Sequence, residues 1–200
     1  DDQPPVDDNH NADDRPGVKV RQQSIDLMTL IGTAAGRARH VLLTEDDATM
    51  CPGALQKMHQ AAEYLQSHEA DWSMVRTSIG LIGIMLQDDD LQSFSDFIQA
   101  HYLQKPPDLL LVEWAHGDWE GGVRAIEATK GRPSKMSTQP PRRHFTVQDN
   151  LFLHIGKTSS LRSTGLKVTP RCDAPLSPFL WDIEMFDRRR CGGSPVSPCK

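Results

Sequence analysis

A short apolar run that ends in consecutive carboxylates constrains this chain most. Residues 40–44, His-Val-Leu-Leu-Thr, have the length and composition of a β-strand, and Glu45, Asp46 and Asp47 follow directly. Stretches in which apolar residues recur at helical spacing lie on both sides of this run. Strands that alternate with helices predict an α/β layer fold, with the acidic motif at the carboxyl end of a strand.

Periodicity along the rest of the chain supports the same fold class. The first helix is expected from Val18, with Ile25, Met28 and Ile31 on its buried face. The further expected elements are a helix from about Pro52, a strand at 72–76, a helix from Asp88, a short helix capped by Asp108, and strand-like pieces at 145–147 and 151–153. Residues 117–143 are rich in Gly and Pro and predict a long loop.

The two ends of the chain differ from this middle part. Residues 1–17 hold six Asp and three Pro and predict a disordered acidic arm. Residues 18–170 are expected to form one domain, and residues 171–200 an irregular tail rich in Cys, Pro and Arg. Cys172, Cys191 and Cys199 in this tail allow a disulfide, but their spacing leaves the pairing open.

Charge and hydropathy exclude some classes of partner. The net charge of −5 offers no basic field for a phosphate backbone, so nucleic acid is not expected as a partner. No apolar run reaches the roughly 20 residues that cross a bilayer, and the N-terminus shows no signal peptide, so the chain carries no visible targeting signal.

The acidic motif predicts a metal site. Three carboxylates at the end of an apolar strand place negative charges close together in a cleft, and a divalent cation would neutralise these charges. Carboxylate oxygens are suitable ligands for Mg²⁺ or Mn²⁺. His154, after the strand-like piece 151–153, is a candidate second ligand beside Asp47. The alternatives are a solvated acidic turn that caps the helix near Pro52, and a hydrogen-bonded core or turn histidine.

Acidic residues in the long loop are the candidate general bases. We expect Asp118 and Glu120 to be the catalytic residues, and Glu113 and Glu127 are further candidates for the general base. A general base must reach the proton that it removes, which spacing alone does not reveal. Solvated loop carboxylates are the alternative interpretation.

The order of these features resembles the N-acetylglucosaminyltransferase IV family, the alpha-1,3-mannosyl-glycoprotein 4-beta-N-acetylglucosaminyltransferases. The resemblance spans roughly residues 18–161. The segments that carry it are 20–26 (Val-Arg-Gln-Gln-Ser-Ile-Asp), 42–47 (Leu-Leu-Thr-Glu-Asp-Asp), 71–74 (Asp-Trp-Ser-Met), 79–83 (Ile-Gly-Leu-Ile-Gly), 90–102, 105–110 (Lys-Pro-Pro-Asp-Leu-Leu) and 151–161 (Leu-Phe-Leu-His-Ile-Gly-Lys-Thr-Ser-Ser-Leu).

The resemblance implies a partial glycosyltransferase A-type, Rossmann-like sandwich over residues 18–170. It implies inverting, metal-dependent transfer of N-acetylglucosamine from UDP-GlcNAc to a mannose of a glycoprotein N-glycan. Asp47 and His154 would hold Mn²⁺ or Mg²⁺, and Arg21, Glu45 and Asp46 would bind the donor. A parent protein in the Golgi is implied, held in the membrane only through an N-terminal anchor that this chain lacks.

Two alternatives stay open beside this activity. A hexosaminyltransferase that acts on a GPI glycan fits the sequence nearly as well. A non-catalytic relic or a glycan-binding module is the second alternative, because only 44 residues precede the acidic motif and residues 135–138 contain no Asp or Glu.

Overall fold

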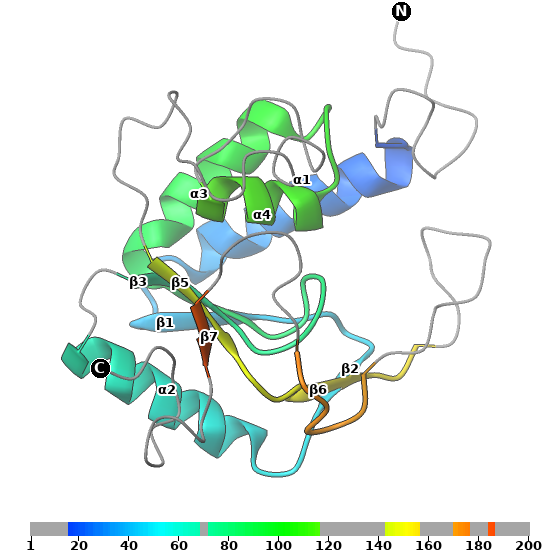
Figure 1. The fold of residues 1–200 in the computed structure, drawn as a ribbon. Helices are drawn as coiled ribbons and strands as arrows, with labels where there is room; N and C mark the ends of the chain where they lie inside the picture. The colour runs from blue at the N-terminus through cyan, green and yellow to red at the C-terminus, as the bar shows by residue number, and fades with distance from the viewer. Residues whose placement is uncertain (1–15, 69–71, 117–142, 157–169, 177–183, 187–200) are drawn as a thin grey trace, which may run out of the picture.

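The computed structural model describes residues 16–68, 72–116, 143–156, 170–176 and 184–186 (Figure 1). The long loop and nearly all of the expected acidic arm lie outside these ranges, as does much of the expected tail. The elements in chain order are α1 (Val18–Ala34), β1 (His40–Leu43), β2 (Ala48–Met50), α2 (Ala54–His68), β3 (Trp72–Arg76), β4 (Ile84–Gln87), α3 (Asp88–His101), α4 (Pro107–His116), β5 (Arg143–Val147), β6 (Phe152–His154) and β7 (Glu184–Phe186).

A five-stranded mixed sheet in the order β1-β4-β3-β5-β7 forms the centre. Strand β4 is antiparallel to both of its neighbours, whereas β3, β5 and β7 run parallel. It follows that β1, β3, β5 and β7 all point the same way, and their carboxyl ends meet at one edge. Strands β2 and β6 form a separate antiparallel ribbon.

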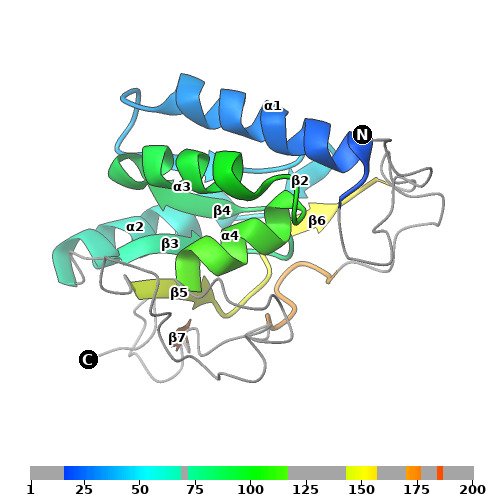
Figure 2. The same ribbon diagram turned by 90° about the horizontal axis from the view of Figure 1, so that it is seen from above.

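Helices cover both faces of the sheet, which confirms the expected α/β class. Figures 1 and 2 show α1, α3 and α4 on one face and α2 on the other. Alternation along the strands divides the core accordingly: Val75 of β3 packs in the cluster on the α2 side, and Met74 packs in the cluster formed with α1, α3 and α4. Because successive side chains of a strand point to opposite faces, the sheet can pack against helices on both sides, which gives three layers: helices, sheet and helix.

The helices form largely where periodicity predicts them. Helix α3 begins with three Asp residues, whose charges favour a helix N-terminus, and buries Leu91, Phe94 and Ile98 as expected. At α1 the expected face is confirmed in part, because Ile31 is buried and Met28 packs against the core. Ile25 is 38% exposed, while Ser24 is buried and donates its hydroxyl to the carbonyl of Val20. The periodicity of apolar residues does not reveal Ser24 as part of this face, and Ser24 can be buried because its hydroxyl is satisfied within the helix.

Three strands have no counterpart among the expected elements: β2, β4 and β7. Strand β4 is an interior strand of the sheet and lies between β1 and β3. None of the described helices is both long enough and apolar enough to cross a membrane.

Candidate metal centre

The acidic motif follows β1 at the edge where the parallel strands end. Ligands in α/β folds bind beyond the carboxyl ends of strands, because loops there converge on one crevice. Glu45 and Asp47 are both partly buried, whereas Asp46 between them is exposed. The motif therefore presents its first and third carboxylates inward and its second to solvent.

The β2–β6 ribbon carries His154 to this motif. Ala48, directly after Asp47, pairs with His154, and the amide of Ile155 donates to the carbonyl of Asp47 at 2.8 Å. Pairing of two short strands thus joins positions more than one hundred residues apart in the chain. Helix α2 begins only at Ala54, after the ribbon strand, so the structure does not support Asp47 as its capping residue.

Three side chains converge at this point. The Nε2 atom of His154 lies 3.2 Å from Oδ2 of Asp47 and 3.4 Å from Oε2 of Glu45. The side chain of His154 is only 9% exposed, and each carboxylate is 35% exposed. One ligand atom from each of the three residues lies within 4.8 Å of the others.

The crowding of carboxylates shifts the ionisation of Glu45. Burial raises its pKa above the usual range, and the charge of Asp47 raises it further, while His154 acts in the opposite direction. Asp108, in the first turn of α4, and Asp46 add smaller increases. The charge of Asp108 therefore reaches the cluster, although the sequence assigned this residue only a capping role.

Two carboxylates and an imidazole form a donor set that fits a divalent cation. Oxygen ligands are preferred by Mg²⁺ and Mn²⁺, and imidazole is a common ligand of first-row transition metals. A cation would also remove the repulsion that opposes ionisation of Glu45, since an opposite charge favours the carboxylate. The structure thus brings Asp47 and His154 together and adds Glu45, which the sequence analysis assigned to the donor.

The other residues proposed from the sequence either have different partners among the described contacts or fall outside the described residues. Arg21 donates Nε to the carbonyl of Pro16 at 2.9 Å, and none of the described contacts joins it to the cluster. Asp118 and Glu120 fall outside the described residues, as does Glu127. Glu113 is buried on α4 and forms an ion pair with Lys105.

A polar network holds the strand-end loops next to the cluster. Asn150 accepts a hydrogen bond from Ser78 at 2.6 Å and donates to the carbonyls of Phe152, Pro170 and Arg171. It joins the loop after β3, the start of β6 and the segment 170–176. Within the part expected to be an irregular tail, this segment therefore contacts the core.

A disulfide bonds Cys51, at the end of β2, to Cys172. Lys57 on α2 adds ion pairs to Asp149 and Asp173 on the same side. Spacing within the tail did not indicate this pairing because the partners are separated by 121 positions. Cys191 and Cys199 lie outside the described residues.

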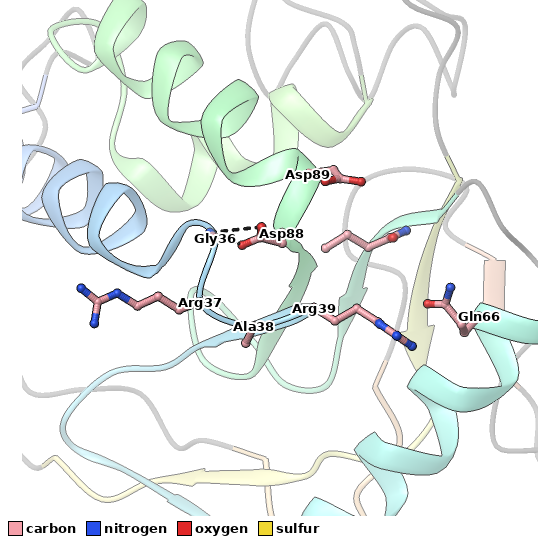
Figure 3. Close-up of a pocket in the computed structure, with 8 residues that line it drawn as sticks. Gly36, Arg37, Ala38, Arg39, Gln66, Asp88 and Asp89 are labelled. Atoms are coloured by element: carbon pink, nitrogen blue, oxygen red, sulfur yellow. Dashed lines mark hydrogen bonds between the residues drawn. The ribbon is translucent and has the colours of Figure 1, made fainter.

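A pocket of about 560 Å³ lies at the opposite end of β1 (Figure 3). It is open and mixed in charge, and the amide of Gly36 donates to the carboxylate of Asp88 at its rim. Its lining residues are Gly36, Arg37, Ala38, Arg39, Gln66, Gln87, Asp88 and Asp89. Residues 36–39 of its lining come before β1, whereas the acidic motif comes after β1. The pocket is therefore separate from the metal-ligand cluster.

Comparison with known proteins supports the resemblance at the level of distant homology. The chain is 30% identical over 150 residues to alpha-1,3-mannosyl-glycoprotein 4-beta-N-acetylglucosaminyltransferase B of both Mus musculus and Homo sapiens, which covers 73% of this chain and 26% of each relative. It is 28% identical over 162 residues to the A enzyme of Bos taurus, covering 80% of this chain and 29% of that protein.

The chain thus spans little more than a quarter of the length of these relatives. No protein-family model matches it. No solved structure matches it significantly. The matched relatives are all N-acetylglucosaminyltransferases by name, and the chain is a distant homologue of this group of transferases.

Proposed function

We propose that this chain forms the metal-binding part of a glycosyltransferase that moves N-acetylglucosamine from UDP-GlcNAc to a mannose of a glycoprotein N-glycan. The cluster of Glu45, Asp47 and His154 is the observation that carries the proposal. The distant similarity to named 4-beta-N-acetylglucosaminyltransferases supports the transfer chemistry and the acceptor.

The cluster residues have distinct roles in this proposal. Asp47 and His154 hold the cation, preferably Mn²⁺, and Glu45 ligates it or orients the donor from the same crevice. The bound cation would supply electrostatic stabilisation of the departing diphosphate. Asp46, which is exposed, contacts the donor rather than the cation in this proposal.

Inverting transfer also needs a base that takes the proton of the acceptor hydroxyl. Asp108 is a candidate, because its charge acts on Glu45 and it lies in the first turn of α4, where its Oδ1 accepts from the amide of Leu109. Asp118 and Glu120, which follow α4 in the chain, stay as the bases proposed from the sequence.

The disulfide supports a secretory compartment for the parent protein. Disulfides persist in oxidising environments and are rare in the cytosol. A bond between Cys51 and Cys172 fits residence in the Golgi lumen, where N-glycans would be the acceptors.

Titration calorimetry with Mn²⁺ and UDP tests the metal site. Asp47→Ala removes an anionic ligand and is expected to abolish metal-dependent UDP binding, whereas His154→Ala removes a neutral ligand and weakens it less. Asp26→Ala on the exposed side of α1 is the matched control and should bind as the unaltered chain does. Unchanged UDP affinity in Asp47→Ala would overturn the site.

Transfer assays then distinguish the candidate activities. The full-length parent is offered several UDP-sugars together with N-glycan or GPI-glycan acceptors, and release of UDP is measured. Asp108→Asn should keep UDP affinity and lose about 10²-fold or more in turnover if Asp108 is the base. Binding of UDP and metal without transfer to any acceptor would favour a non-catalytic, glycan-binding role.

A further inference from the structure

The backbone of Gly156 lies directly against the carboxylate of Asp47. A Cβ atom built on Gly156 would stand 2.1 Å from Oδ2 and 3.0 Å from Cγ of Asp47. It would also stand 3.0 Å from Cε1 of His154. Any side chain at this position would therefore occupy the volume of the metal-ligand cluster itself.

Conformational freedom does not explain this glycine. Gly36, Gly53, Gly80 and Gly83 have positive φ angles, which favour glycine on backbone grounds alone, and Gly156 is not among the positive-φ residues. The absence of a side chain at Gly156 thus matters through the space that it leaves and not through its backbone angles.

We infer that Gly156 is a positioning residue, which sets the carboxylate of Asp47 in the geometry that the cluster needs. The amide of Ile155 holds the carbonyl of Asp47, and the next residue leaves room for the side chain of Asp47 to turn towards Nε2 of His154. This inference rests on the proposed metal site.

The obstructed atom belongs to the end of a side chain, so the obstruction is relieved by rotating Asp47 rather than by shifting the backbone. We therefore expect Gly156→Ala to fold and to displace the carboxylate from the cluster. Metal affinity should fall at least about tenfold, the scale on which residues that orient ligands act.

Two measurements test the inference. A crystal structure of the metal-free Gly156→Ala protein should show that Asp47 has lost its contact with His154, and calorimetry with Mn²⁺ should show the weaker binding. Gly32→Ala is the matched control, because a Cβ there meets nothing within 4 Å and its φ is not positive, and its affinity should be unchanged.

The outcomes separate this inference from the proposed function. If the unaltered chain binds no Mn²⁺, the proposed function fails, and the crystal structure still decides whether Gly156 positions Asp47. An undisplaced carboxylate, or undiminished affinity in Gly156→Ala, overturns the inference. If Gly156→Ala does not fold, Asp47→Ala/Gly156→Ala decides: folding of this double variant supports the inference, and its failure to fold overturns it.

Discussion

At the scale of single residues, the surroundings of Glu45 oppose the ionisation of its carboxyl group. Burial first, and then the charge of Asp47, raise its pKa in the folded state. The folded state therefore binds this proton more tightly than the unfolded state does. The ionised carboxylate opposes folding above the raised pKa, and this effect is relieved as the pH falls through that pKa towards the usual range near 4.3.

We expect Glu45→Gln to raise the melting temperature of the metal-free protein at neutral pH, because glutamine carries no charge that must be buried. The gain should shrink as the pH is lowered and vanish below the usual carboxyl range. Thermal unfolding from about pH 3 to about pH 8 measures this. Glu63→Gln, at an exposed position on α2, serves as the control. A gain that does not change with pH would contradict the explanation.

The elements explain how distant residues come together. Neither the acidic motif nor His154 forms a site alone, and the ribbon of β2 and β6 joins them through three paired positions. Asn150 lies just before β6, and its side chain is fully buried. The side-chain amide forms hydrogen bonds with four partners. Each partner is a backbone carbonyl or a buried hydroxyl, so this one side chain adds to the backbone hydrogen bonds that join the same loops.

Asn150→Ala is expected to lower the free energy of unfolding by about 3 kcal/mol, since it leaves several buried polar groups unpaired. Asn150→Asp should be comparably harmful, because it places an oxygen against the carbonyls. Urea denaturation measures both. Gln92→Ala is the control, as the amide of Gln92 bonds only at the exposed surface of α3, and it should change stability little. A small effect of Asn150→Ala would show that the loops hold without the network.

The helices and the alternating strand β3 could be predicted from the sequence because their signals are local. Strand β4 could not, because Ile84, Met85 and Leu86 are apolar without alternation and run directly into a helix. Strand β2 has only three residues, which are too few to show a period. The pairing of β2 with β6, which brings His154 to Asp47, depends on contacts between distant segments that no periodicity reveals.

At the site, too, features with a local sequence signal could be predicted, whereas contacts between distant segments could not. Asp47 and His154 were paired from their places at strand ends and from the resemblance, and the structure puts them 3.2 Å apart. The packing of Gly156 against Asp47 and the charge of Asp108 on Glu45 arise only in the folded chain.

Across the whole molecule, one covalent link joins the end of β2 to a segment near the far end of the described chain. The disulfide of Cys51 and Cys172 closes a loop across 121 positions. Closing a loop of this length restricts the unfolded chain strongly, whereas the folded chain already holds the two ends together through Lys57 and Asn150.

We expect Cys51→Ala/Cys172→Ala to lower the free energy of unfolding by about 4 kcal/mol, because the unfolded chain regains this freedom. Urea denaturation measures the loss. Reduction of the unaltered protein should have a similar effect, and the double variant should respond to reductant less. Equal responses of both proteins to reductant would place the sensitive bond elsewhere in the chain.

The division of the cluster between two distant segments has a consequence for gene models and splice forms. A transcript that ends before residue 152 would still encode Glu45, Asp46 and Asp47, but it would lack both the imidazole of His154 and the glycine that leaves room for Asp47. Such a transcript would pass a search for the acidic motif and encode no complete cluster. In genomes, the motif therefore has to be read together with the Leu-Phe-Leu-His-Ile-Gly segment, whose last three residues contact it in the fold.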